Sequence, residues 1–282
     1  MKENTLIFPA RFNRDKNKWD FIYNSWENTN AKMLKLITLN TWFDDFYFEE
    51  RFRAITEILR ELKADVIALQ EITDKSLGII LKEDWVKDNY FISDISGSTF
   101  SSYGVILLSR IPIKNLNLYP LASIMNRHVL IAEFVINEQK ILIGTTHLES
   151  LNFSAPIRYV QLKNIFALLN VSNNSVLMGD FNFCSSWNEN SNIDNSYLDF
   201  WETLRSDNPG YTVYTDINIM RKKSKSGEKK VRFDRIISRS AKYCWKPKKI
   251  NRIGMKSISP ECPDIFPSDH FGLIGLLEWC KK

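Results

Sequence analysis

Residues 175–182 read SVLMGDFN, a short apolar run followed by glycine, aspartate and asparagine around one phenylalanine. Residues 175–178 have the length and apolar content of a buried β-strand. Asp180 and Asn182 then lie just past the strand end, where a rigid element can hold polar side chains in a site. Taken alone the signal is weak, because an aspartate or asparagine after a strand is more often a turn or a helix cap.

The same pattern recurs along the chain. Polar residues next to apolar strand segments are, in chain order, Asn40, Glu71, His147 and the pair Asp269 and His270. The chain has only three histidines, and two of them belong to this series. Each residue alone has an ordinary structural explanation, but the ordered set predicts one functional site at the ends of several strands.

Oxygen-rich side chains in this series favour a hard metal ion. Mg²⁺ prefers oxygen ligands and keeps several waters, so one or two protein carboxylates suffice to hold it. We expect Glu71 to be the first ligand, with Asn40 and Asp269 completing the site. Such an ion neutralises charge on a phosphate and on a leaving oxygen, so the set suits hydrolysis of a phosphate ester.

The remaining residues of the series fit the other roles in this chemistry. Asp180 is our candidate for activating water, with Asn182 orienting the water or the phosphate. His270 and His147 can hydrogen-bond the non-bridging oxygens as charge develops. A histidine in that role needs its other nitrogen fixed by a partner, and Asp234 fits that role for His270. A surface salt bridge is the alternative explanation for Asp234.

The rest of the chain predicts an α/β fold. Strand-like segments outnumber helical ones, and the helices fall between strands, which suggests a two-sheet core covered by helices. Expected strands lie at 33–39, 65–69, 104–109, 129–136, 140–145, 175–178, 233–238 and 271–278, with helices at 49–62 and 157–169. No break in composition divides 34–282, so we expect one domain there.

Three segments lie outside this pattern. Residues 1–33 are expected to form an N-terminal arm packed on the domain surface, with a partner-binding segment as the alternative. The stretch 183–231 is expected to be irregular. Within it, 221–230 reads RKKSKSGEKK and carries six basic residues. It is either a solvated loop or an arm that contacts phosphate or acts in targeting.

Composition excludes several classes of protein. Apolar residues make up 44% of the 282, which excludes a disordered chain. No apolar run approaches the roughly 20 residues of a membrane span, and the first 33 residues lack a signal-peptide core. The four cysteines form no CxxC pair, as expected for free thiols in a reducing compartment. We therefore expect a soluble, intracellular protein, nuclear or cytoplasmic, with no membrane partner.

Four short motifs in order resemble the endonuclease/exonuclease/phosphatase superfamily. They are ITLN at 37–40, LQE at 69–71, GDFN at 179–182 and SDH at 268–270. The resemblance implies a four-layer α/β sandwich of the DNase I type, with two packed mixed β-sheets flanked by helices. It also implies Mg²⁺-dependent cleavage of a phosphoester, with Mn²⁺ as an alternative ion.

Three longer runs are similar to the tyrosyl-DNA phosphodiesterase 2 branch of this superfamily: THLES at 146–150, RFDRI at 232–236 and FPSDHFGL at 266–273. This resemblance implies a metal ligand at Glu71, a general base at Asp180 partnered by Asn182, a phosphate-binding histidine at His270, and metal-site residues at Asn40 and Asp269. It also places substrate-binding residues at Arg127, Trp201, Tyr214 and Arg232.

Some positions depart from the branch. Leu39 precedes Asn40 where the family usually has tryptophan. Residues 183–186 read FCSS, without the arginine that helps the branch hold DNA. Tyr214 stands near the position of a stacking tryptophan. These departures leave the residues of the hydrolase chemistry in place and concern the part that holds the substrate.

The resemblance therefore implies a phosphodiesterase that hydrolyses the 5′-phosphotyrosyl bond between DNA and a trapped topoisomerase peptide, an activity in DNA repair. Its partner would be a DNA 5′ end, with RNA as a further candidate, and we expect a monomer. Alternatives are a DNA or RNA nuclease, or a phosphatase acting on RNA ends, nucleotides or phospholipid head groups. The third hypothesis is a catalytically inactive protein that uses the same site only to bind a ligand.

Overall fold

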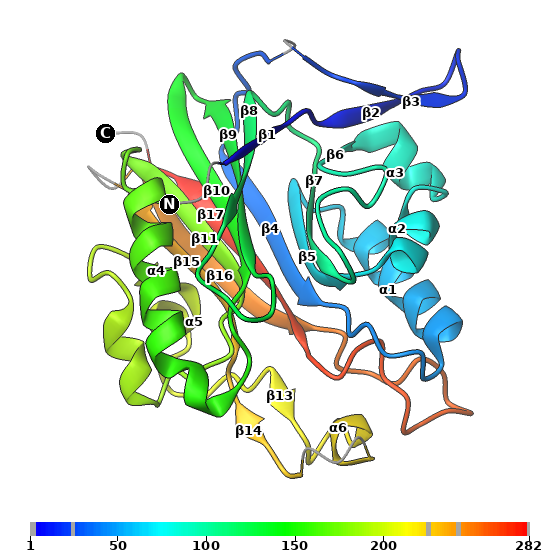
Figure 1. Cartoon of the computed structure of the whole chain (residues 1–282), viewed down its shortest axis with the longest axis vertical. Coiled ribbons are helices and arrows are strands. Elements are labelled where there is room, and N and C mark those ends of the chain that lie inside the picture. Colours follow the sequence, from blue (N-terminus) through cyan, green and yellow to red (C-terminus); the bar gives the residue numbers. More distant parts are fainter. Residues whose placement is uncertain (1–3, 24–25, 224–226, 241–243, 281–282) are drawn as a thin grey trace.

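Two mixed β-sheets pack face to face, and helices cover their outer faces (Figure 1). The computed structural model describes residues 4–23, 26–223, 227–240 and 244–280. The order in the larger sheet is β16-β17-β4-β5-β7-β6-β2-β3, and in the smaller sheet it is β1-β8-β9-β10-β11-β15-β12. A separate hairpin pairs β13 with β14.

Among the described residues, the larger sheet has eight strands and the smaller sheet has seven. The larger sheet contains β2 (Ala10–Asn13), β3 (Lys18–Phe21), β4 (Met33–Asn40), β5 (Val66–Ile72), β6 (Phe91–Ile92), β7 (Gly104–Ser109), β16 (Trp245–Ile253) and β17 (Gly272–Trp279). The smaller sheet contains β1 (Thr5–Ile7), β8 (Asn115–Pro120), β9 (His128–Ile136), β10 (Gln139–His147), β11 (Asn174–Asp180), β12 (Leu198–Asp199) and β15 (Asp234–Ser240).

Alternation along the strands divides the apolar residues among three layers of core. Side chains at i and i+2 of a strand share one face, so Leu36 of β4 and Val176 of β11 enter the core between the sheets. Ile37 faces outward, into the core under α1 (Phe48–Leu62), α2 (Asp74–Ile80) and α3 (Asp84–Asn89). Leu177 faces α4 (Ala155–Leu169). The layers are thus helix, sheet, sheet and helix.

The region 183–231 is more ordered than we expected. The prediction of a long irregular segment is wrong, since it contains a 3₁₀ helix at Asn188–Asn192, strand β12, helices α5 (Phe200–Leu204) and α6 (Met220–Lys223), and the hairpin β13 (Val213–Tyr214) and β14 (Lys230–Val231). Each element is five residues or shorter. Elements this short leave too few periods for hydrophobic patterning to be visible in the sequence.

Residues 1–33, predicted as an arm, contribute to both sheets. Strand β1 pairs with β8 at the edge of the smaller sheet. Strand β2 pairs with β6, and β3 with β2, at the edge of the larger one. Ala10 is buried, whereas Phe21 and Tyr23 are exposed. The boundary at residue 33 between this segment and the rest stays a prediction.

Two further expectations concern the environment of the protein. Cys184, Cys244, Cys262 and Cys280 are all free thiols, as predicted. In the part of the chain that the structure describes, none of the helices is both long and apolar enough to cross a bilayer.

Candidate active site

Strand register in the smaller sheet brings three of the predicted residues side by side. The parallel pair β10 and β11 aligns His147 with Asp180. The antiparallel pair β11 and β15 aligns Asp180 with Asp234. Because two of these strands end here and the third begins here, all three side chains lie at one edge of the sheet.

The larger sheet presents Asn40 and Glu71 at the ends of the parallel strands β4 and β5, where Asn40 pairs with Gln70. The register of β5 against β7 shifts between Gln70 and Ile72, and the intervening Glu71 has a left-handed φ of 61°. A bulge of this kind re-aims a side chain and strains a non-glycine residue, and such features cluster at functional sites.

A single amide connects the contributions of the two sheets. Asn40 Nδ2 donates to Glu71 Oε1 at 3.1 Å and to Asp180 Oδ2 at 3.0 Å. Deeper in the core, Thr38 donates to Gln70 Oε1 and Gln70 Nε2 donates to Thr145 Oγ1, at 3.2 and 3.1 Å. These buried hydrogen bonds fix the two sheets relative to one another below the site.

Asp180 is a buried carboxylate that is held ionised. Burial opposes its charge, but His270, His147 and hydrogen bonds outweigh that effect and lower its pKa. The backbone N–H of Asn182 donates to Asp180 Oδ1 at 2.9 Å. His147 Nε2 lies 3.4 Å from Asp180 Oδ2. An ionised carboxylate in this position can accept a proton.

His270 is held as a buried cation. Its Nδ1 lies 2.8 Å from Asp234 Oδ2. Burial opposes the charge on the ring, but Asp234, Asp269 and Asp180 outweigh burial and raise the pKa of His270 to about 10. Since both ring nitrogens then carry protons, Nε2 can donate to an anion while Asp234 fixes the ring.

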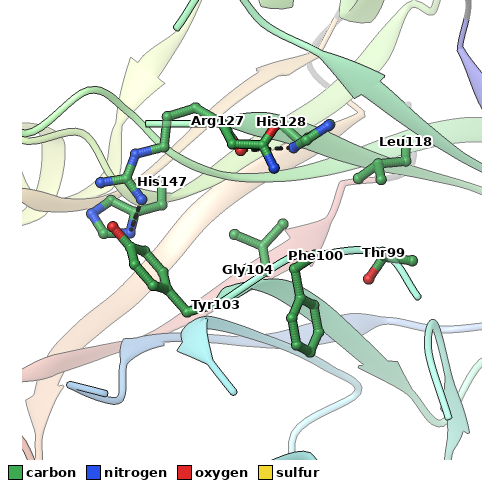
Figure 2. Close-up of a pocket in the computed structure, with 10 residues that line it drawn as sticks. Thr99, Phe100, Tyr103, Gly104, Leu118, Arg127, His128 and His147 are labelled. Carbon is green, nitrogen blue, oxygen red and sulfur yellow. Dashed lines mark hydrogen bonds between the residues drawn. The ribbon is translucent and has the colours of Figure 1, made fainter. Parts of the chain in front are cut away.

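His147 is the neutral member of the pair of histidines. Arg127 Nη1 lies 3.1 Å from its Nδ1 (Figure 2). Burial and the charge on Arg127 lower the pKa of His147 to about 3. A neutral ring that accepts from Arg127 at Nδ1 carries its proton on Nε2, the atom that faces Asp180.

Glu71 and Asp269 form an acidic pair that a metal ion would stabilise. Burial and the charge of Asp269 raise the pKa of Glu71 to about 7. This unfavourable proximity of two carboxylates, with Asn40 beside them, fits a divalent cation with oxygen ligands. Asp180, Asp234 and His270 also lie close enough together to hold a metal, but His270 Nδ1 is already paired with Asp234.

Arg221 adds a positive charge beside Asp269 and His270. Its Nη1 lies 3.0 Å from Asp269 Oδ2 and 3.3 Å from His270 Nε2. Because both Arg221 and the charged His270 carry protons at this contact, only the approach to Asp269 is an attractive pair. The sequence placed Arg221 in a basic run whose role was open, and nothing in its spacing indicated that it reaches the site.

A buried arginine of α1 holds the loops on which the site depends. Arg51 donates to the carbonyl oxygens of Phe46, Thr41, Pro267, Trp42 and Asp44. Burial lowers its pKa to about 10, which still leaves it charged at neutral pH. Sequence reasoning missed Arg51 because an arginine in an amphipathic helix is usually exposed.

Sequence reasoning also missed two hydroxyl groups that hold residues of the site in place. Ser268 Oγ donates to Asn40 O at 2.6 Å and accepts from His270 N at 3.1 Å. Thr212 Oγ1 accepts from the N–H groups of Phe233 and Asp234, both at 3.1 Å. Ser268 lies within the SDH motif, which was the one signal for it in the sequence.

The four predicted substrate-binding residues divide into two groups. Arg127 contacts His147, and Tyr214 is half-buried on the β13–β14 hairpin, packed edge-on against Tyr211. Trp201 and Arg232 are buried and contact other residues than those of the active site. Trp201 Nε1 donates to Asn208 O, and the Arg232 guanidinium is paired with Asp199 and Glu202.

Comparison with known sequences identifies the family of this chain and several relatives. The sequence pattern of the Endonuclease/Exonuclease/phosphatase family matches residues 37–270. Tyrosyl-DNA phosphodiesterase 2 of Homo sapiens is 29% identical over 263 residues, which cover 89% of this chain and 70% of the relative. The protein of the same name from Rattus norvegicus is 26% identical over 283 residues, which cover 94% of this chain and 73% of the relative.

Solved structures agree in fold. Tyrosyl-DNA phosphodiesterase 2 of Danio rerio, complexed with a single-strand DNA product, matches with a TM-score of 0.77 at 24% identity, over 88% of this chain and 100% of that one. The human Nocturnin catalytic domain with bound sulfate matches with a TM-score of 0.64 at 14% identity, over 88% and 95%. The expected four-layer α/β sandwich is confirmed. Since the family pattern spans most of the chain, this protein belongs to the endonuclease/exonuclease/phosphatase family.

Proposed function

We propose that this protein is a Mg²⁺-dependent phosphodiesterase that hydrolyses 5′-phosphotyrosyl–DNA bonds. The observation that carries the proposal is the setting of Asp180, a buried carboxylate with a lowered pKa, flanked by two histidines and joined through Asn40 to Glu71. The names of the curated relatives, all tyrosyl-DNA phosphodiesterase 2, support the choice of substrate.

The proposed reaction is an in-line displacement by water. Asp180 accepts a proton from water as the water oxygen bonds to phosphorus. The bond between phosphorus and the phenolic oxygen breaks, leaving a 5′-phosphate on the DNA and a tyrosine phenolate that takes up a proton from solvent. A phenol with a pKa of about 10 is a good leaving group, so this step needs no strong general acid.

The other residues of the site fit roles around this step. We assign His270, charged and fixed by Asp234, to the non-bridging oxygens, where it would stabilise developing charge. His147 would donate from Nε2 to the same region. Asn182 donates from its side chain to Leu148 O at 2.9 Å, which fixes the side chain that would orient the water.

Glu71 and Asp269, with Asn40, would hold the metal. When bound, a Mg²⁺ ion, or Mn²⁺ in its place, supplies positive charge to the phosphate and to the leaving oxygen. Arg221 occupies Asp269 in the structure, so metal binding would compete with that ion pair.

The DNA would be held by charge and stacking on the side of the β13–β14 hairpin. Arg127 and Tyr214 are the residues we assign to substrate binding. The hairpin and α6 lie at the end of the sheets toward which β4 points (Figure 1). The Danio rerio relative binds a single-strand DNA product, and we infer the same substrate form here. We expect a monomer, acting inside the cell in the nucleus or the cytoplasm.

A second candidate is a nuclease or phosphatase of the same family acting on DNA, RNA, nucleotides or phospholipid head groups. The run 183–186 favours it, because Phe183 and Cys184 are buried and no arginine follows the GDFN motif.

The test uses one oligonucleotide in three forms: with a 5′-phosphotyrosyl end, with a 3′-phosphotyrosyl end, and unmodified. We expect release of tyrosine from the 5′ form alone, in Mg²⁺ but not in EDTA. Glu71→Ala should abolish release, because it removes the proposed metal ligand, while Glu57→Ala on α1 serves as the matched control. Cleavage of the unmodified oligonucleotide, or activity on none of the three, would move the function to the second candidate.

A further inference from the structure

An exposed aromatic ring lies at the rim of the site, outside every role assigned above. Phe43 is 46% exposed. Its ring is stacked on that of Tyr103, with 4.7 Å between centroids and 10° between planes. Tyr103 covers one side of Phe43, which leaves a flat, rigid apolar surface open to a ligand.

Phe43 is held by the residues of the site itself. Its backbone N–H donates to Glu71 Oε2 at 3.0 Å. The preceding Trp42 has a left-handed φ of 58°, and its N–H donates to Asn40 Oδ1 at 3.0 Å. An unusual backbone conformation at a bulky residue persists only where its surroundings hold it, so the position of Phe43 is fixed relative to Glu71.

Tyr103 is held from the other side of the site. The Arg127 guanidinium carbon lies 5.3 Å from the centroid of its ring, and the His147 ring lies 6.3 Å away. Figure 2 shows the hydroxyl end of Tyr103 directed toward His147 and Arg127. The two rings therefore form an aromatic shelf that extends from Glu71 to the Arg127–His147 pair.

We infer that this aromatic shelf, Phe43 stacked on Tyr103, binds the phenolic ring of the tyrosyl leaving group. The inference rests on the proposed function and adds a subsite to it. An aryl ring that stacks on Phe43 would be selected over an alkyl group, because offset stacking adds to the gain from burying apolar area.

In-line geometry favours the leaving group over a DNA base as the occupant. Water activated by Asp180 attacks phosphorus opposite the leaving oxygen, so the leaving group departs on the side away from Asp180. The shelf lies at Glu71, which would hold the ion that neutralises the leaving oxygen. A phenolic ring is bonded directly to that oxygen, whereas a DNA base is separated from phosphorus by the 5′ methylene and the sugar.

The test measures binding, so that it does not depend on turnover. In an Asp180→Asn background, with Mg²⁺ present, the Kd is measured for a 5′-phosphotyrosyl oligonucleotide and for the same oligonucleotide with a 5′-phosphate. We expect Phe43→Ala to weaken binding of the tyrosyl form by roughly threefold to tenfold and to leave binding of the phosphate form unchanged. Phe43→Tyr should restore the difference.

Phe21→Ala is the matched control, because Phe21 is 47% exposed and lies on β3, the outermost strand of the larger sheet. It should leave both Kd values unchanged. Equal weakening of both ligands by Phe43→Ala would assign the shelf to a DNA base, and no weakening of either would show that nothing stacks there; both results overturn the inference. Failure of the proposed function would appear separately, as no release of tyrosine by the wild-type protein.

Discussion

Single side chains in this protein serve the site by satisfying several partners at once. Asn40 donates to carboxylates from both sheets. Arg51 satisfies five carbonyl oxygens in two loops that flank the site. Buried carbonyls that lose their donor cost about 1–3 kcal/mol each when water cannot replace it, so Arg51 has a large effect on stability for a residue that touches no substrate.

Arg51→Lys tests this role. Lysine keeps the charge, but its one nitrogen has three donors and cannot reach all five carbonyls. We expect a loss of about 2–3 kcal/mol, which lowers Tm by roughly 3–5 °C for a chain of this size. Arg60→Lys, an exposed arginine on the same helix, is the control. Equal Tm values for the two variants, measured by thermal unfolding, would contradict the role of Arg51.

At the scale of elements, the site is built where strands end. Strands β4, β5, β10 and β11 are long, apolar and parallel in pairs, which is why polar residues at their ends were visible in the sequence. Strand β16 was missed because WKPKKINRI carries four basic residues and a proline. Those residues are typical of an edge strand, where hydrophobic alternation is weak.

Contacts made by tertiary packing could not be predicted in this way. Arg221 reaches Asp269 from a helix of four residues, and Tyr103 stacks on Phe43 across 60 positions of sequence. For Trp201 and Arg232, in contrast, the sequence predicted a contact with substrate that the structure does not indicate. Similarity in sequence suggested contact with substrate, but the structure surrounds Trp201 with core residues and pairs Arg232 with buried and half-exposed carboxylates.

The β13–β14 hairpin and α6 carry the basic charge that the sequence left unassigned. Lys222 and Lys230 pair with Glu228 and Asp216 within this element, which reduces its net positive charge. If DNA lies against it, replacing Lys222, Lys229 and Lys230 by glutamine should weaken binding and lower the salt slope by about 0.7 for each lost phosphate contact. Binding of the 5′-phosphate oligonucleotide at several salt concentrations measures this slope.

Lys246, Lys248 and Lys249 of β16 provide a control with the same number of charges on the edge strand of the larger sheet. Their replacement by glutamine should leave the slope unchanged. An unaltered slope in the hairpin variant would return residues 221–230 to the role of a solvated loop.

At the scale of the whole molecule, neither sheet holds a complete site. The larger sheet supplies Asn40 and Glu71, the smaller one supplies His147, Asp180 and Asp234, and the buried Thr38–Gln70–Thr145 hydrogen bonds lock their relative position. Asp269 and His270 enter from the loop before β17. This two-sheet arrangement explains why the functional residues are spread over more than 200 positions of sequence yet were recognisable by their order.

The most direct test of the account is single-turnover cleavage of the 5′-phosphotyrosyl oligonucleotide by Asp180→Asn. Asparagine keeps the shape of the side chain but cannot accept the proton, so the rate should fall by roughly 10²–10⁴-fold while the Kd for the oligonucleotide changes little. Asp84→Asn, at an exposed position of α3, should match the wild type. A rate for Asp180→Asn within tenfold of the wild type would contradict the central claim that Asp180 activates the water.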